Sequence, residues 1–395
     1  IFIWVVSPTT ALANIEYLVP IKPGKDLKII GGKRVLDSIK TKVNQFLGRG
    51  TSSIFVPPMD GRLKANDILD KTEVLSEIEK VDNLTVFGEH IYASSHNKLV
   101  KIIENTPEII ETLDYEITAL AFGSSGVLAI GLSNDTVLCY DVGRKSIILE
   151  VEFECVTALL FWDPETLVVA SGSQQFSAPD WRSDLMNLGS TGSLWVFNVE
   201  SRSKKYLVGD LKWPAGLCKL NDQLLFSEAW NHAVNLIEFA AAGDFEIKSN
   251  QEILSRLPAY PSRIVNTQDN CIWLCLFAPR NQLIEFVLTE KDYRAKMLSQ
   301  VDERFWIAPS FRSGLDFREP LQGGGVKMMG VLKPWAPAFS YGLVVKLDRN
   351  FQPEKSLHSR ADGKAHGITS AACLPEGQLF LSSRGDNKVI RYIEQ

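Results

Sequence analysis

One apolar stretch occurs twice in this chain, as ITALAF at residues 117–122 and again as VTALLF at residues 156–161. The two copies lie about 40 residues apart, which is the usual length of one four-stranded blade of a β-propeller. After each copy the chain passes through a turn, a second apolar stretch, a polar turn and a third strand-like stretch. This recurring phrase decides the fold.

Six phrases of this kind follow one another from residue 81 onward. They occupy residues 81–102, 117–140, 156–197, 215–236, 262–286 and 367–392. The segments are β-rich, are separated by turns and lack the 3.6-residue period of a helical repeat. Five polar turns contain an Asn, a residue that tolerates positive φ, and these are Asn97, Asn134, Asn231, Asn281 and Asn387. The sequence therefore predicts an all-β fold, a six-bladed β-propeller.

Two long insertions interrupt the repeat. The third phrase contains one at about residues 171–191, and the fifth is followed by one at about residues 288–340, which begins with the helix-like stretch EKDYRAKML at residues 290–298. Residues 341–358 then have the pattern of a two-stranded hairpin that finishes the fifth blade. Because long insertions in compact domains tend to be lids or binding loops, we expect a partly helical insertion in the fifth blade near a ligand site.

The first 80 residues carry no clear phrase. The chain begins with the apolar run IFIWVV, and ALA at residues 11–13 has the form of a signal-peptidase site. Residues 1–13 are expected to be the remnant of a signal peptide or membrane anchor, and the alternative is a strand that packs on the domain. The first interpretation predicts an exported, periplasmic or extracytoplasmic, or membrane-anchored protein. Residues 14–80 would be a leading segment that packs on or closes the propeller of residues 81–395.

The composition excludes one class of partner. The 395 residues are 45% hydrophobic and 23% charged, which is ordinary for a globular protein. The formal net charge is −5 and no long run of Lys or Arg occurs, so a nucleic-acid partner is not expected. The six cysteines lie mostly in apolar stretches without a CxxC pair. We expect buried thiols, with a disulfide or redox role as the alternative.

Several pieces of sequence resemble one known family. They are TGSLWVF at 191–197, WPAGL at 213–217, SEAW at 227–230, LPAYP at 257–261, YGLVVKL at 341–347 and SLH at 356–358. In this order the chain resembles the strictosidine-synthase-like six-bladed propellers, in particular the branch with adipocyte plasma membrane-associated protein and its bacterial relatives. The resemblance covers about residues 80–395. It implies the same propeller, often with an N-terminal anchor and a helical insertion before the YGLV strand.

In propellers, polar side chains converge on the mouth of the central channel from the starts of the innermost strands. Alignment of the six phrases places these candidates there: Asp82, Asn83, Thr118, Thr157, Glu228, Trp230, Arg263, His366 and Ser370. We expect all but the last two to form a ligand-binding channel. Arg263 could grip a carboxylate or phosphate, or could form an internal salt bridge with Glu228 or Asp82.

The resemblance also bears on metal binding. The related gluconolactonase and senescence-marker propellers hold a divalent cation through Glu and Asn or Asp oxygens, a donor set that suits Ca²⁺. Here PAG at residues 214–216 lacks the amide, and Arg263 brings a cation where the family has a carboxylate. No metal or other cofactor is expected, and Ca²⁺ is disfavoured. Any residual site would use Asp82, Asn83 and Glu228, whose alternatives are pairing with Arg263 or solvated turns.

The catalytic Glu of strictosidine synthase corresponds to about Ser370 here, so the chain is not expected to be a true strictosidine synthase. His366 lies close to Ser370 in sequence, which suggests a hydrolase of the arylesterase or lactonase type, although a solvated loop His is the alternative. The leading hypothesis is a propeller that binds a small organic, anionic molecule in a lidded channel and hydrolyses an ester or lactone. The competing hypothesis is a non-catalytic binding or scaffold propeller with a degenerate active site.

Overall fold

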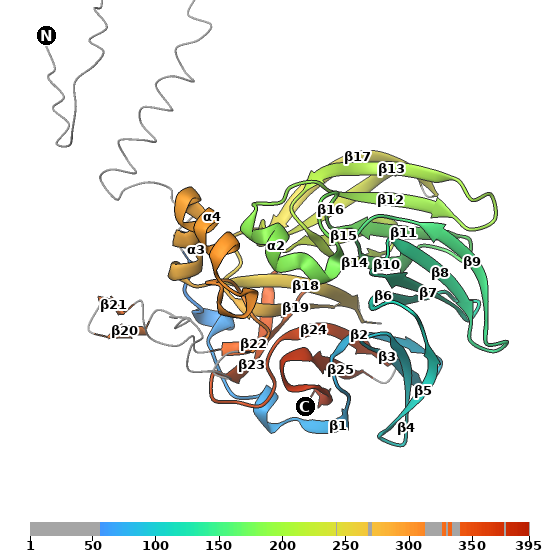
Figure 1. Ribbon diagram of the computed structural model, residues 1–395. Coiled ribbons are helices and arrows are strands. Elements are labelled where there is room, and N and C mark those ends of the chain that lie inside the picture. The colour runs from blue at the N-terminus through green and yellow to red at the C-terminus, as the bar shows by residue number, and fades with distance from the viewer. Residues whose placement is uncertain are drawn as a thin grey trace, which may run out of the picture. The chain divides into compact units, whose positions relative to one another are not determined.

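The computed structural model describes residues 56–241, 243–267, 271–312, 326–328, 331–333, 340–374 and 377–394. All of them belong to the unit formed by residues 53–395. Their strands form six four-stranded antiparallel sheets and one short hairpin. Figure 1 shows the sheets arranged around a common centre, so the predicted six-bladed β-propeller is confirmed.

Each of the first three blades is a run of four consecutive strands. Blade 1 contains β2 (Val81–Phe87), β3 (His90–Ser95), β4 (Lys98–Ile103) and β5 (Thr106–Thr112). Blade 2 contains β6 (Ile117–Phe122), β7 (Val127–Leu132), β8 (Thr136–Asp141) and β9 (Ser146–Glu152). Blade 3 contains β10 (Val156–Phe161), β11 (Thr166–Ser171), β12 (Gly192–Asn198) and β13 (Lys204–Leu211).

The last three blades include the insertion and the closure. Blade 4 contains β14 (Pro214–Leu220), β15 (Gln223–Glu228), β16 (Ala233–Ala241) and β17 (Asp244–Leu254). Blade 5 contains β18 (Ala259–Asn266), β19 (Ile272–Pro279), β22 (Ser340–Leu347) and β23 (Pro353–Arg360). Blade 6 contains β24 (Ile368–Cys373), β25 (Gln378–Ser383), β26 (Lys388–Ile393) and, from the other end of the chain, β1 (Glu73–Glu77).

The innermost strand of each blade contacts the innermost strands of the two neighbouring blades, so β2, β6, β10, β14, β18 and β24 form a closed ring. The pairing of β1 with β26 joins residues from both ends of the described chain within one sheet. Ahead of β1, the 3₁₀ turns η1 (Gly61–Leu63) and η2 (Leu69–Lys71) contact β23. Asp70 accepts hydrogen bonds there from Ser359 Oγ at 2.6 Å and from Lys364 N at 2.9 Å.

Short helices occupy both insertions. The first contains η3 (Ala178–Asp180) and α2 (Trp181–Met186), and the second contains α3 (Gln282–Thr289), α4 (Lys291–Gln300), η4 (Glu303–Phe305) and the hairpin β20 (Val326–Met328) with β21 (Val331–Lys333). Helix α2 contacts α4, so the two insertions meet. The predicted helical insertion in the fifth blade is therefore confirmed.

Among the described helices none is long and apolar enough to cross a membrane, and residues 1–13, the predicted anchor remnant, lie outside the described residues.

One predicted strand is wrong. Residues 281–286 were expected to end the fifth phrase as its third strand, but they begin helix α3. The Asn281 side chain accepts a hydrogen bond from Ile284 N at 2.9 Å, as a helix N-cap does. Buried Ile284 and Val287 then lie on one helical face. The third strand of blade 5 is β22, on the far side of the insertion.

The positive φ expected of the turn asparagines is wrong for four of the five. Only Asn387 among them has a positive φ, of 55°. In three of the other turns the residue beside the Asn adopts that conformation, and these residues are His96, Asp135 and His232. The turns are where the sequence predicts them, but the left-handed residue is shifted by one position.

Candidate functional site

Every innermost strand carries an irregularity close to its start. The register shifts between Ile117 and Ala119 in β6 and between Val156 and Ala158 in β10, and the other four innermost strands shift at equivalent places. A β-bulge re-aims the side chain that it leaves out of the ladder. All but one of the bulged positions line one pocket, and these are Asp82, Thr118, Thr157, Ala215, Ser262, Arg263 and Thr369; the exception is Asn83, which shares a bulge with Asp82. We call this hollow the mouth pocket.

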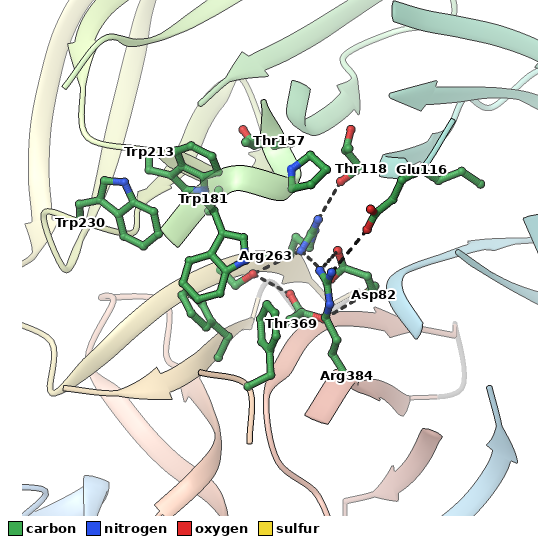
Figure 2. A pocket seen from close by; sticks show the side chains of 17 residues that line it. Asp82, Glu116, Thr118, Thr157, Trp181, Trp213, Trp230, Arg263, Thr369 and Arg384 are labelled. Carbon is green, nitrogen blue, oxygen red and sulfur yellow. Dashed lines mark hydrogen bonds and ion pairs between the residues drawn. The ribbon is translucent and has the colours of Figure 1, made fainter. Parts of the chain in front are cut away.

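Four charged side chains form a connected cluster in the mouth pocket (Figure 2). Asp82 Oδ1 lies 3.2 Å from Arg263 Nη1, and Asp82 Oδ2 lies 2.8 Å from Arg384 Nη1. Burial by itself would raise the pKa of the Asp82 carboxyl, but the two guanidinium groups outweigh burial and lower the pKa. Asp82 is therefore a carboxylate at neutral pH. The fourth member, Glu116, is held more loosely, with Oε1 3.5 Å from Arg384 Nη2.

Aromatic side chains form the opposite side of the mouth pocket. Figure 2 shows Trp181, Trp213 and Trp230 facing the charged cluster. The Trp230 ring stacks on Trp213 with centroids 5.3 Å apart and on Trp181 with centroids 6.1 Å apart. Phe277 and Phe311 extend this wall, with their centroids 5.2–5.4 Å from that of Trp181. Such offset and edge contacts are the arrangements that aromatic rings favour.

A buried carboxyl holds the wall in place. Trp230 Nε1 donates to Asp184 Oδ1 at 2.8 Å, and both side chains are buried. Asp184 comes from α2, so this bond ties the first insertion to blade 4. Burial raises the pKa of the Asp184 carboxyl, and hydrogen bonds from Ser173 and Trp230 only partly offset it. The insertion thus supplies both Trp181 and the group that orients Trp230.

The hydroxyl groups of the mouth pocket differ in whether they have a hydrogen-bond partner. Ser262 Oγ donates to the Thr369 carbonyl at 2.8 Å, and Thr369 Oγ1 donates to the Asp82 carbonyl at 3.0 Å. Thr157 Oγ1 donates to the Pro214 carbonyl. Thr118 Oγ1 is buried and has no hydrogen-bond partner among the described residues. Buried polar groups normally have a partner, so this hydroxyl is available to a ligand.

Two residues predicted for the channel do not line its mouth. Glu228 does not line the mouth pocket; its Oε1 accepts from Lys212 N at 2.9 Å and its Oε2 from Asn235 Nδ2 at 2.8 Å. Asn83 Nδ2 donates to Ser94 Oγ at 3.0 Å, and Asn83 lines a second hollow farther along the same strands. Asp82, Thr118, Thr157, Trp230 and Arg263 do come together at the mouth.

The predicted catalytic pair is not joined by any contact. His366 lies with Nδ1 3.2 Å from Asp386 Oδ2 and Nε2 2.8 Å from the Arg360 carbonyl, and it lines neither hollow. Ser370 Oγ accepts from Leu84 N at 3.0 Å and lines the second hollow. Proximity in sequence did not bring them together because His366 lies ahead of β24, against Asp386, whereas Ser370 lies inside β24 and follows the bulge at Thr369.

The oxygen donors named for a metal do not fit a divalent cation. Asp82 is engaged by two guanidinium groups, while Asn83 and Glu228 are bonded to other protein groups away from it. Ca²⁺ needs six to eight converging oxygens, and two cations beside the carboxylate would repel it. Across the described residues no group of three or more His, Cys, Asp or Glu side chains has a metal-binding arrangement.

Sequence reasoning missed several members of the mouth pocket, among them Glu116, Trp181, Phe277, Phe311 and Arg384. A signal existed for two of them. Trp181 lies in the first insertion, which the spacing had marked as a lid. Arg384 directly follows the second strand of its blade, just as the predicted Trp230 follows the second strand of blade 4. Phe277 lies in β19 and Phe311 within the second insertion, and neither was marked by the repeat.

The second hollow is made almost entirely of repeat residues. It has a volume of about 280 Å³, against about 70 Å³ for the mouth pocket. Its lining comes from the later residues of the innermost strands and includes Leu84, Leu120, Leu160 and Leu217. Arg263 lines both hollows, so its side chain separates the two halves of the channel. We call the second hollow the far pocket.

The sequence matches no family model and no curated protein. Solved structures resemble it in fold. A luciferin-regenerating enzyme is 12% identical, with a TM-score of 0.51 over 82% of this chain and 93% of that one. Regucalcin from Agrobacterium tumefaciens, described as a calcium-binding protein, is 9% identical, with a TM-score of 0.52 over 83% and 95%. A gluconolactonase from Xanthomonas campestris is 8% identical, with a TM-score of 0.53 over 80% and 87%. At such identities the likeness shows the propeller fold alone, and the strictosidine-synthase-like branch stays a prediction.

Proposed function

We propose that this protein binds a small organic molecule in the mouth pocket, and that binding rather than hydrolysis is its function. The supporting observation is one hollow with an aromatic wall on one side and a charged cluster on the other. Small-molecule sites combine mostly apolar walls with a few precisely placed polar groups. A planar ligand suits this lining, because flat rings face a group of charged side chains.

The hydrolase alternative needs a nucleophile with a base in reach and a group that orients the base. In the mouth pocket, the hydroxyls of Thr157, Ser262 and Thr369 donate to main-chain carbonyls, and no His is among the described lining residues. The name of the gluconolactonase neighbour is therefore a weaker guide than the pocket. A binding propeller of the strictosidine-synthase-like branch, without acid or base chemistry at Ser370, fits these observations better.

Thermal melts of the full chain with a panel of neutral, anionic and cationic ring compounds test this proposal. Any compound that binds the folded state raises the melting temperature in a concentration-dependent way. The same compounds' aryl esters and a set of lactones are assayed for turnover in parallel. Stabilisation without turnover is expected. If turnover is seen and disappears when Asp82 or Thr118 is substituted, the protein is an enzyme and the binding proposal is wrong. If no compound of the panel stabilises the protein, the proposal is also refuted.

A further inference from the structure

Arg384 has hydrogen-bonding capacity that the protein leaves unused. Its Cζ lies 4.5 Å from the centre of the Phe311 ring, so the ring supports the guanidinium. Nη1 is bonded to Asp82 at 2.8 Å, but Nη2 reaches Glu116 only at 3.5 Å, beyond the usual 2.7–2.9 Å of a charge-assisted bond. Among the described residues its Nε has no partner. A guanidinium carries five N–H donors, so several remain for a ligand.

The four charges of the cluster cancel in number, but its two carboxylates are held unequally. Arg263 and Arg384 share the single carboxylate of Asp82. The remaining positive charge is balanced only by Glu116, whose second oxygen lies 3.5 Å from His96 Nδ1 and whose side chain is 24% exposed. Long contacts and access to water make Glu116 the most easily displaced anion of the cluster. A ligand anion could therefore take over its place beside Arg384.

A second and independent observation points to the same ligand group. Thr118 Oγ1 is buried, lines the mouth pocket and lacks a partner among the described residues. The carbonyl of the same residue already accepts from Arg263 Nη2 at 2.9 Å, which fixes the strand beside the cluster. Figure 2 shows Thr118 and Arg263 on the same side of the pocket as Arg384. A donor hydroxyl next to a partly paired guanidinium is an arrangement that suits an oxygen anion.

The charge count and the wall together select the class of ligand. Displacement of Glu116 would leave one positive charge of the cluster unbalanced, and one positive charge matches a monoanionic carboxylate better than a phosphate, which carries about two negative charges at neutral pH. The rings of Trp181, Phe277 and Phe311 offer a stacking surface of the kind that planar rings occupy. Resting on the proposed binding function, we propose that the mouth pocket binds an aromatic monocarboxylate, whose carboxylate replaces Glu116 at Arg384 and accepts a hydrogen bond from Thr118.

Calorimetric titration of the full chain with matched pairs of compounds tests this assignment. The pairs are benzoate with benzamide, phenylacetate with phenylacetamide and 2-naphthoate with 2-naphthamide, since each amide keeps the ring and removes the charge. At least one carboxylate should bind ten-fold or more tightly than its amide. If the amide binds equally well or better, the proposal is wrong while the binding function stands. If no member of any pair binds, both are wrong.

Substitutions then locate the carboxylate. Arg384→Gln should weaken binding of the carboxylate to the level of its amide and leave the amide unaffected. Arg391→Gln is the matched control, because Arg391 pairs with Glu73 on the outer strands of blade 6, away from the mouth. Unchanged carboxylate binding in Arg384→Gln, or an equal loss in Arg391→Gln, would overturn the assignment.

Two further variants keep the test decisive if Arg384→Gln folds poorly. Glu116→Gln leaves Asp82 between both guanidinium groups and removes the competing anion, so it should bind the carboxylate three-fold or more tightly than the wild type does. Thr118→Val keeps the shape of the side chain but loses the hydroxyl, and it should bind the carboxylate three-fold or more weakly. An unchanged affinity in both variants would contradict the proposed exchange.

Discussion

The two halves of the channel are built from the same six strands, yet their chemistry differs. At the mouth, bulged residues such as Asp82 and Thr118 meet aromatic side chains from the insertions. Farther along the same strands, Leu84 and Leu120 line a hollow about four times as large, from about 280 Å³ against about 70 Å³. The comparison teaches that the repeat makes the channel, whereas bulges and insertions give its mouth the charged and aromatic lining on which the proposed binding site rests. Volume alone would have pointed to the far pocket instead.

The largest effect is expected from Trp230→Ala in the mouth. This removes a buried ring from a stack and leaves the Asp184 carboxyl without its indole donor, which should cost about 3–5 kcal/mol of unfolding free energy. Denaturant unfolding measures it. Leu217→Ala in the far pocket should cost about 2–3 kcal/mol but leave ligand affinity unchanged. A loss of ligand binding in Leu217→Ala would contradict the claim that the ligand binds at the mouth and not in the far pocket.

The next largest effect is expected from Asp82→Asn. The substitution leaves two neighbouring guanidinium groups without their shared carboxylate, and breaking a buried ion pair costs about 3–5 kcal/mol. Because the side chains of Arg263 and Arg384 are 20% and 24% exposed, solvent should reduce the cost to about 2–3 kcal/mol. Asp67→Asn is the control, since its pair with Lys71 lies on the surface and should not matter measurably. Equal melting temperatures for wild type and Asp82→Asn would contradict the role of the cluster.

The pH dependence of stability sharpens this prediction. The pKa of Asp82 is lowered on folding from an unfolded value of 3.8, so its contribution is present above about pH 4 and lost as the pH falls through the lower folded value. The difference in stability between wild type and Asp82→Asn should therefore shrink below pH 4. Burial raises the pKa of the Asp184 carboxyl, so this group has the opposite effect on stability. Its contribution to the stability of the folded state is fully present below pH 3.8 and is lost as the pH rises through the raised folded value. Unfolding curves of Asp82→Asn and Asp184→Asn from about pH 2.5 to about pH 7, a range that includes the ordinary pKa of an Asp carboxyl, would separate the two groups.

A smaller effect, on binding alone, is expected from Trp181→Ala. The ring is only partly buried, so its loss should weaken an aromatic ligand about five-fold, equivalent to about 1 kcal/mol of stacking. Trp195→Ala provides the match, since Trp195 is also partly buried but packs against Phe153 and Tyr206, outside the mouth. Fluorescence titration should show weaker binding only in Trp181→Ala. Equal affinities in the two variants would show that the Trp181 ring does not contribute to ligand binding.

The smallest effect is expected from Ser370→Ala. Its hydroxyl accepts from Leu84 N, so the substitution should cost about 1 kcal/mol of stability through one lost hydrogen bond. Ligand affinity should not change, because the side chain lies in the far pocket. Chemical unfolding and ligand titration of the same preparation measure both quantities. Abolished turnover of an ester in Ser370→Ala would instead restore the predicted catalytic serine.

Prediction from sequence worked best where local pattern and global fold agree. The strands of blade 2, residues 117–122, 127–132 and 136–141, match the second phrase almost residue for residue. It failed at residues 281–286, where the order Asn, polar, apolar, apolar fits both a strand after a turn and a capped helix. Only the packing of Ile284 and Val287 against the insertion decides between these two structures.

For the site, sequence reasoning located the mouth through residues that begin the innermost strands. Thr118 and Thr157 could be found because the two copies of the repeat align them. Arg384 could not be recognised as the second partner of Asp82, since the two residues lie 302 positions apart and meet only when blade 6 closes against blade 1. Phe311 likewise reaches the mouth from an insertion with no repeat to align it.

The sequence by itself determined the number of blades, the places of the insertions and the polar residues at the strand starts, because these follow from a short repeat and from side-chain alternation. Only the tertiary structure decided which of those residues share one pocket. Bulges turned Asp82 and Arg263 into the mouth, while Asn83, from the same bulge as Asp82, and Ser370 line the far pocket. Arg384 reaches Asp82 only because blade 6 packs against blade 1 and closes the ring. A contact between residues so far apart in sequence depends on packing that no local pattern encodes.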